Sequence, residues 1–451
     1  MRGGGDHLKA VIVGAGEVGF HLASVLSREG QEVSVVDRSP EAIDKVNESL
    51  DVLTVVGHGA GVKVLRNAET AAADLFVAVT DADEVNLLSC LAARSMGAKR
   101  TVARVSSWVY LRGAKQVYRD LLDVDLVISP EALASAEIAK AVKSPAVLSL
   151  ETFAAGKVLV KQLKLDRGCK FCRKELKDIH LPEGTLVAGV LRGGDMIIPH
   201  GDDSLQVNDC AYIIGKAESM ARIEKTFGLD PPPTQRVVIV GGGEVGFQTA
   251  QMLRRARLDV RIIEKDEGRC AHLSEYLKGV TVLHGDGTEL SFLREEISGI
   301  DLFVGASGDD EVNILTALLA KELGARKSVV VVEKPDYSPV YDRIGVDQAI
   351  SPRQLAANAI LRFLRRGDVV SVAMLEDGKA EVLELIAGPK SRVAGKKLSE
   401  MRFPKGSLVG AIVRKDEVIV PGGDDEIMRG DTVILFVLPE VLQKVGRLFQ
   451  K

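Results

Sequence analysis

The chain has 451 residues, a net charge of −4 at pH 7 and 27% charged residues. With 4% aromatic residues and a single Trp, it has neither the basic surface nor the stacking residues that a nucleic-acid partner would require, so none is expected. Its 46% hydrophobic residues can fill sizeable cores, yet no apolar run approaches the roughly 18 residues of a membrane span, and residues 1–7 lack the apolar centre of a signal peptide.

From Lys9 to Lys143, short β-branched apolar runs alternate with helical patterns. This alternation is typical of a parallel sheet covered by helices on both faces, and right-handed crossovers would make the sheet doubly wound. The pattern predicts strands at 9–13, 32–36, 51–56, 74–79, 100–105 and 125–128, and helices at 17–28, 40–49, 60–68, 83–96 and 130–142, with further helix between 105 and 125.

The pattern changes after Pro145. Residues 146–165 and 185–214 have the character of short strands, joined by turns that contain Gly, Asn and Asp, and they predict a small β-rich domain. Pro231-Pro232-Pro233 follows and is expected to act as a stiff spacer.

Five cysteines are too few and too scattered for a disulfide scaffold, which favours a reducing cytoplasm. Cys169 and Cys172 form the one suggestive pair. A zinc site usually needs a second pair or a nearby His, and a redox motif should open a helix after a strand. The second half of the chain lacks this pair, so we interpret it as incidental.

The second half repeats the first. The stretch A-V-I-V-G-A-G-E-V-G at 10–19 returns as V-V-I-V-G-G-G-E-V-G at 237–246, and further matched blocks follow in the same order at 80–86 and 307–313, 128–131 and 350–353, 181–187 and 403–409, and 199–203 and 421–425. We predict a duplicated Rossmann-like, doubly wound parallel-sheet α/β domain, each copy followed by a small β-rich α+β domain. The expected boundaries are 8–143, 146–228, 235–360 and 369–449.

In the first copy a predicted strand leads through G-x-G-x-x-G into a predicted helix, which is the dinucleotide-binding fingerprint. Its first glycine permits the tight turn, the second lets a pyrophosphate approach the backbone, and the third allows close packing of helix on strand. The phosphates would lie at the positive N-terminus of the helix. The candidate ligand-binding residues of this loop are Gly14, Ala15, Gly16, Glu17, Val18 and Gly19.

An acidic residue follows each fingerprint at the same distance. Asp37 follows Gly19 at close to the spacing of a ribose-binding carboxylate, and it favours NAD over NADP because it repels a 2′-phosphate. Arg38 would soften that repulsion. In the second copy Glu264 follows at the same spacing after a loop made of Gly241, Gly242, Gly243, Glu244, Val245 and Gly246. The alternative is a fold that has lost its ligand, and it is stronger for the second copy, where other features diverge.

Two further positions differ between the copies. Arg104, at the end of a predicted strand, is a candidate phosphate or adenine contact, with a surface ion pair as the alternative; its expected counterpart is Glu333, or Lys334 with a one-residue shift. His58 matches Asp286, and either would line the cleft or cap the next helix. The two sites are therefore expected to be unequal.

The sequence offers no catalytic constellation. A dehydrogenase of this architecture needs an acid/base group, such as a His or Lys with an orienting carboxylate, and none of the seven His belongs to a group that both copies repeat. Asp202-Asp203 and Asp424-Asp425 follow glycine and are expected to cap turns. Duplicated nucleotide sites without a catalytic unit favour sensing, so we expect no enzyme activity.

Together these motifs resemble the regulator of potassium conductance (RCK) family, in the tandem form that controls Trk-type potassium uptake. The resemblance covers the chain from Ala10 to about Phe449. It is carried by G-A-G-E-V-G at 14–19, V-D at 36–37, V-x-G-H-G at 55–59 followed by V-L at 64–65, V-T at 79–80, D-E-x-N at 83–86, A-R-V at 103–105, I-V-G-G-G at 239–243, G-D-G-T at 285–288 and L-V-G-A-I-V-R at 408–414.

The resemblance implies RCK N-terminal (KTN) and C-terminal domains in tandem. It implies a cytoplasmic subunit, peripheral on the inner face of the membrane, that binds NAD(H) and also ATP or ADP and gates a TrkH/TrkG-like integral-membrane potassium transporter subunit. It also implies a homo-oligomer, a tetramer with eight nucleotide-binding domains in a ring. By matched position Thr80, Asp81 and Arg104 would join the loop and Asp37 in contacting nucleotide. The alternatives are a regulator of another cation channel or antiporter, or an NAD-dependent oxidoreductase.

Overall fold

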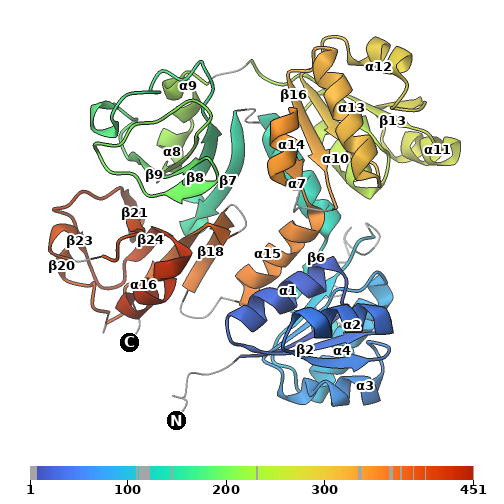
Figure 1. The fold of residues 1–451 in the computed structure, drawn as a ribbon, viewed down its shortest axis with the longest axis horizontal. Helices are drawn as coiled ribbons and strands as arrows, with labels where there is room; N and C mark the ends of the chain where they lie inside the picture. The colour runs from blue at the N-terminus through green and yellow to red at the C-terminus, as the bar shows by residue number, and fades with distance from the viewer. Residues whose placement is uncertain are drawn as a thin grey trace. The chain divides into compact units, whose positions relative to one another are not determined.

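The computed structural model describes residues 8–107, 110, 122–143, 146–229, 232–333, 338–364, 369–375, 378–389, 391–401 and 403–449. The further helix expected between 105 and 125 falls mostly outside these residues, as do Pro231 and Lys334. The chain forms two compact units, Met1–Ala139 with Thr234–Phe363, and Lys140–Pro233 with Leu364–Lys451 (Figure 1). Each unit therefore contains the corresponding domains of both copies.

In the first unit, the first copy forms a six-stranded parallel sheet in the order β3-β2-β1-β4-β5-β6, the order of a Rossmann fold. Most of the expected elements are present, with ends within about two residues of the predicted ones. They are β1 (Lys9–Val13), α1 (Glu17–Arg28), β2 (Glu32–Asp37), α2 (Pro40–Ser49), β3 (Leu53–Val56), α3 (Val62–Asn67), β4 (Leu75–Ala78), α4 (Asp83–Met96), β5 (Thr101–Arg104), β6 (Leu126–Ile128) and α7 (Pro130–Lys143).

The second copy repeats this sheet as β14-β13-β12-β15-β16-β17, also parallel. The predicted duplicated α/β fold is confirmed. Its elements are β12 (Arg236–Val240), α10 (Glu244–Arg254), β13 (Asp259–Glu264), α11 (Glu267–Tyr276), β14 (Thr281–His284), α12 (Leu290–Ile297), β15 (Leu302–Gly305), α13 (Asp310–Glu322), β16 (Lys327–Val331), α14 (Ser338–Ile344), β17 (Gln348–Ile350) and α15 (Pro352–Leu364).

Burial of the β-branched runs explains why these segments form strands. Residues of β1 and β4 are almost fully buried and pack against apolar residues of α4, so both faces of the sheet exclude water. Ser39 and Asp266 cap the helices that follow β2 and β13 by accepting a backbone N–H three residues later. Within the described ranges, no helix combines the length and apolar composition needed to cross a bilayer.

The second unit contains two five-stranded antiparallel sheets, β10-β9-β11-β8-β7 and β18-β19-β24-β21-β22, plus the short pair β20-β23. The strands are β7 (Val147–Phe153), β8 (Val158–Lys164), β9 (Thr185–Arg192), β10 (Asp195–Ile197), β11 (Cys210–Lys216), β18 (Val369–Leu375), β19 (Ala380–Ile386), β20 (Lys396–Lys397), β21 (Ser407–Arg414), β22 (Glu417–Ile419), β23 (Glu426–Ile427) and β24 (Thr432–Val437). Helices α8 (Ala217–Met220), α9 (Ile223–Phe227) and α16 (Leu442–Phe449) follow the last strand of each sheet.

The two antiparallel sheets share one hydrophobic core. The rings of Tyr212 and Phe436 lie 5.8 Å apart between their centroids. Two glycines make the close approach possible: a Cβ at Gly189 would lie 2.5 Å from the Phe436 ring, and a Cβ at Gly410 would lie 2.5 Å from Ile214. The sheets therefore interlock through side chains from both copies.

Candidate nucleotide-binding site

The glycine loop between β1 and α1 leaves its backbone open on one side. Gly14 has φ of +105°, a conformation that L side chains rarely adopt. A Cβ at Gly19 would lie 1.8 Å from the Gly14 carbonyl oxygen, so only glycine lets the helix pack this closely. A Cβ at Gly16, which precedes the helix, would have no neighbour within 4 Å. The open space at Gly16 fits an approaching phosphate.

A cavity of about 440 Å³ lies over this loop. Because β1 and β4 are neighbours at the point where the strand order reverses, the cavity lies where doubly wound sheets bind their ligands. Among the predicted residues, those that line it are Gly14, Gly16, Glu17, Val18, Asp37, His58, Thr80, Asp81 and Arg104. Ala15 and Gly19 belong to the loop without lining the cavity. Sequence reasoning did not include Ser39 or Arg353 among the candidates, and both line it.

Asp37 connects the strand end to the glycine loop. Its Oδ2 accepts a hydrogen bond from the Ala15 backbone N–H at 2.6 Å, and its Oδ1 accepts one from the Ser39 N–H at 2.9 Å. Each carboxylate oxygen retains acceptor capacity for a ribose hydroxyl. In the second copy Glu264 accepts from Gly242 at 2.7 Å and from Asp266 at 2.9 Å, so the acidic residue has the same structural role in both copies.

Asn86 positions the segment that contains Thr80. Its Oδ1 accepts from the Thr80 N–H at 2.8 Å and from Oγ1 at 2.7 Å, and its Nδ2 donates to the carbonyl oxygens of Thr80 and Arg104, both at 3.0 Å. Asn313 makes the same bonds to Ser307 and Val331. Both asparagines are fully buried. Their recurrence in the repeated block was the signal that could have identified them.

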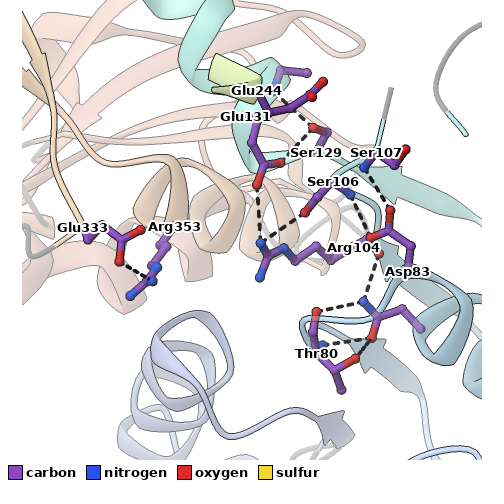
Figure 2. Close-up of polar contacts among 12 residues, drawn as sticks. Thr80, Asp83, Arg104, Ser106, Ser107, Ser129, Glu131, Glu244, Glu333 and Arg353 are labelled. Atoms are coloured by element: carbon purple, nitrogen blue, oxygen red, sulfur yellow. Dashed lines mark hydrogen bonds and ion pairs between the residues drawn. The ribbon is translucent and has the colours of Figure 1, made fainter. Parts of the chain in front are cut away.

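Arg104 carries a donor that no described residue satisfies. Its Nη2 lies 3.1 Å from the Ser106 Oγ and 3.4 Å from the Glu131 Oε1, whereas its Nε is buried and has no hydrogen-bond partner (Figure 2). A buried donor without a partner costs free energy, and an anionic ligand in the cavity would supply one. Arg104 thus lines the cavity, as a phosphate or adenine contact requires, and also forms an ion pair with Glu131, which was the alternative expectation for this residue.

The prediction that Glu333 or Lys334 is the counterpart of Arg104 was wrong. Thr101 pairs with Phe76 and Ser328 pairs with Phe303, the equivalent positions of the repeat. Counting along the strands places Val331 opposite Ile350, as Arg104 lies opposite Ile128. Glu333 instead matches Ser106. The Glu333 N–H donates to Asp310 at the start of α13, and the Ser106 N–H donates to Asp83 at the start of α4.

The N-terminal part of the last helix in each copy contacts the other copy. Arg353, at the start of α15, lines the cavity of the first copy and forms an ion pair with Glu333 at 2.5 Å between Nη2 and Oε2 (Figure 2). In the opposite direction, the Ser135 Oγ of α7 contacts the Val245 carbonyl oxygen at 3.1 Å. The first site is therefore built from residues of both copies.

The second site has different charged neighbours. Gly241 and Gly246 reproduce the tight loop geometry, with φ of +104° at the former. Burial raises the pKa of Glu244 above its ordinary value, and the negative charge of Glu131 raises it further. Arg269, at the position of the cavity-lining Ala42, donates from Nε to the Gly242 carbonyl oxygen at 2.6 Å. The predicted inequality of the two sites agrees with this geometry.

His58 and Asp286 have different surroundings. His58 lines the cavity, and its Nδ1 accepts the Ala60 N–H at 3.3 Å. Asp286 accepts bonds from the Thr288 N–H and Oγ1, at 2.8 and 2.7 Å, and these bonds lower the pKa of Asp286. Asp286 therefore stabilises the turn before α12 and does not cap that helix, whose N-cap position is Glu289, whereas His58 lines the cavity, as one of the two expected roles required.

The remaining polar candidates are structural. Burial raises the pKa of Cys172 to about 12, with a smaller contribution from the hydrogen bond to Cys169, so the Cys172 thiol stays protonated at neutral pH. In the part of the chain that the structure describes, no group of three or more His, Cys, Asp or Glu residues is placed to hold a metal ion. Asp203 and Asp425 accept backbone N–H groups within their own turns, as expected. Asp202 and Asp424 do not cap these turns and instead pair with Lys177 and Lys397.

Comparison with known proteins identifies relatives over the whole chain. The TrkA-N domain family model matches residues 10–130 and 237–352, and the TrkA-C domain family model matches residues 160–228 and 382–450. Trk system potassium uptake protein TrkA homolog 1 of Methanosarcina mazei is 38% identical over 98% of this chain and all of its own length. The homolog from Archaeoglobus fulgidus is 37% identical over 98% of this chain and all of its own length, and TrkA from Halomonas elongata is 35% identical over 98% and 99%.

Solved structures show the same fold. The GsuK channel superposes with a TM-score of 0.66 at 20% identity, over 98% of this chain and 79% of the channel chain. The GsuK RCK domain has a TM-score of 0.65 at 20% identity, over 98% and 95%. The GsuK channel bound to NAD has a TM-score of 0.64 at 20% identity, over 98% and 79%.

Proposed function

Because the chain belongs to the TrkA family of Trk-system potassium uptake proteins, we propose that it is a nucleotide-sensing regulatory subunit that gates a separate integral-membrane potassium transporter subunit. The cavity over the first glycine loop carries this proposal. It offers an open approach at Gly16, a ribose-binding acid at Asp37 and a buried, unpartnered donor on Arg104. These are the features that an adenosine with a pyrophosphate requires.

NAD(H) is the first ligand proposed for this cavity, and ATP or ADP the second. The solved GsuK channels bound to NAD and to ADP support both choices, because their fold is the same. Asp37 would accept the ribose hydroxyls, and the N-terminus of α1 would face the phosphates. When bound, the nucleotide supplies charge and hydrogen-bonding groups to the residues around the cavity, and no chemical step on it is proposed.

Gating follows from unequal affinity for two conformations. A ligand shifts a conformational equilibrium only through a difference in affinity for the two states, and a tenfold difference is worth about 1.4 kcal/mol per site. Moving a gate from mostly closed to mostly open takes about 5.5 kcal/mol. Several sites acting together reach that value, so we propose a homo-oligomer, a tetramer, at the cytoplasmic face of the membrane.

Exposed apolar residues support an assembly surface in each copy. Val62 and Leu88 on α3 and α4 are about half exposed, at 54% each, and the equivalent residues of the second copy, Leu290 and Leu315, are exposed to 46% and 49%. Contiguous exposed apolar patches mark interaction surfaces, and we propose that these matched residues belong to one in each copy. Leu88→Asp combined with Leu315→Asp should lower the mass of the assembly, as measured by light scattering.

The direct test is potassium flux through proteoliposomes that contain the Trk-type membrane subunit of the same organism. Flux should change when this protein and NADH, ATP or ADP are added together, and the change should be smaller with Asp37→Asn. A flux that is the same with and without the protein, for every nucleotide, would refute the regulatory role. Steady oxidation of NADH with added metabolites would instead favour an oxidoreductase.

A further inference from the structure

We propose that Arg353, although it belongs to the second copy, binds the terminal phosphate of a nucleoside triphosphate in the first site and thereby distinguishes triphosphates from diphosphates. This inference rests on the proposed function, since it assumes a nucleotide in that cavity. The structural basis is that Arg353 lines the cavity together with Arg104 of the first copy.

The strand order fixes which part of a ligand would meet these arginines. Asp37 ends β2, the N-terminus of α1 follows β1, and Arg104 ends β5, in a sheet ordered β3-β2-β1-β4-β5-β6. A nucleotide with its ribose at Asp37 and its first two phosphates at α1 therefore continues across β4 toward β5. Its remaining group enters the region of Arg104 and Arg353.

The chemistry of that remaining group differs among the candidate nucleotides. ATP places a terminal phosphate there, whereas ADP places nothing. NADH places a ribose and an uncharged ring there. A guanidinium forms paired, charge-assisted hydrogen bonds with phosphate oxygens, which ribose hydroxyls do not match. Two arginines in this region therefore favour the triphosphate.

Of the two arginines, Arg353 is the one that a ligand can recruit at little cost. Its ion pair with Glu333 is exposed, with 35% of the Arg353 side chain and 53% of the Glu333 side chain accessible. Exposed pairs contribute little to stability. The pair of Arg104 with Glu131 is more enclosed, at 24% and 16%, and Glu131 also contacts the Ser129 Oγ at 3.1 Å. A terminal phosphate would thus displace Glu333 from Arg353 while Arg104 donates from its unpartnered Nε.

This exchange would connect the two copies through the ligand. Arg353 and Glu333 both belong to the second copy, the former at the start of α15 and the latter two residues after the end of β16. In the structure, the two side chains form an ion pair with each other. With a triphosphate bound, Arg353 would hold a ligand whose other contacts are in the first copy. The terminal phosphate of a triphosphate would therefore connect the two copies through Arg353. ADP and NADH have no group that makes this contact.

The test uses the full chain and compares dissociation constants for ATP, ADP and NADH by isothermal titration calorimetry. Arg353→Gln should weaken ATP binding by about tenfold or more, with ADP and NADH changed far less. Arg353→Lys, which keeps the charge without the planar fork, should fall between. Glu333→Gln should strengthen ATP binding, because it removes the competing carboxylate. Arg362→Gln on the same helix, outside the cavity lining, serves as the matched control, and thermal unfolding verifies the fold of each variant.

The outcomes separate this inference from the proposed function. If wild-type protein binds none of the three nucleotides, both are overturned. If it binds them and Arg353→Gln leaves the ratio of ATP to ADP affinity unchanged, the terminal-phosphate role is wrong while nucleotide sensing stands. An equal loss for all three ligands would likewise overturn discrimination, because it would place Arg353 at the shared phosphates.

Discussion

Glu131 and Arg353 occupy the same position in the two copies, directly after the proline that begins α7 and α15, yet they carry opposite charges. Their ion-pair partners are also reversed. Arg104 of the first copy pairs with Glu131, and Glu333 of the second copy pairs with Arg353. Because each helix start reaches toward the other copy, the first cavity gains a cation while the surroundings of Glu244 gain an anion. The duplicated sites thus differ in the charged residues that the other copy contributes.

Substitution of the two loop glycines should separate binding from folding. A side chain at Gly16 meets no protein atom within 4 Å, so Gly16→Val should fold with stability changed by less than about 0.5 kcal/mol but lose NADH binding by filling the phosphate approach. Gly19→Val should lower the free energy of unfolding by about 3 kcal/mol or more, because its Cβ would overlap the Gly14 carbonyl. Urea unfolding and NADH fluorescence measure the two effects. A Gly16→Val protein that still binds NADH normally would contradict this assignment.

The carboxylate of Asp37 should contribute to affinity beyond its role in the loop. Asp37→Asn keeps one acceptor oxygen and should weaken NADH binding about tenfold, since a charged acceptor of ribose hydroxyls is lost. Glu264→Gln makes the equivalent change in the second copy and is the matched control for damage to the loop. An Asp37→Asn protein that binds NADH as tightly as wild type would show that the carboxylate charge contributes nothing to binding.

The second site should bind nucleotide more weakly as pH rises. The raised pKa of Glu244 means that this carboxyl ionises above its ordinary value of 4.5. Its protonated form is compatible with a nearby phosphate, and its ionised form repels one. Affinity at this site should therefore be highest at low pH and should fall as pH rises through the raised pKa. Glu244→Gln should remove the pH dependence, which titrations at several pH values would show. A second site whose affinity is the same at every pH would exclude this electrostatic explanation.

A buried lysine should make the protein more stable in mildly alkaline solution. Lys327 is 8% exposed, and burial lowers its pKa from 10.5 to about 8, against the opposing effect of Asp347. Between these two pH values the unfolded chain binds a proton that the folded chain does not, so the free energy of unfolding should rise with pH across that interval. Lys327→Met should be more stable at pH 7 by on the order of 3 kcal/mol.

Thermal or urea unfolding between pH 7 and pH 10 measures this difference. Lys265→Met replaces an exposed lysine and should leave the pH profile unchanged. If Lys327→Met had the same dependence of stability on pH as wild type, the cost of burying the charged Lys327 amine would be fully offset by its contacts in the folded protein.

Much of the first unit could be predicted from sequence because its signals are local. The glycine loops, the apolar runs and the acidic residue after the second strand each depend on a few neighbouring residues, and the structure places them as expected. The domain boundaries and the ligand-binding roles of the site residues stay predictions. Arg353 could not be identified in this way, since its place in the cavity depends on how the two copies, which are distant in sequence, pack together.

The counterpart of Arg104 shows a second limit. The apolar run of the second copy continues through Val331 and Val332 to the first polar residue at Glu333, and matching polar ends therefore chose the wrong position. Only the pairing of β16 with β15 and β17 identifies Val331. The register of a parallel sheet depends on the neighbouring strands, which a single strand sequence does not specify.

The shared core of the antiparallel sheets also determines which half can pair with which. Ile214 and Phe436 are equivalent through their partners Val160 and Val382, and Gly189 is equivalent to Ala411. The larger Phe436 ring fits against Gly189 of the other half. If two second halves paired, Phe436 would face Ala411 instead of Gly189. The methyl group of Ala411 would then occupy the space that the glycine leaves for the ring. The second half therefore fits the first half better than it would fit a duplicate of itself. The fit of these residues therefore depends on the presence of both halves in one polypeptide.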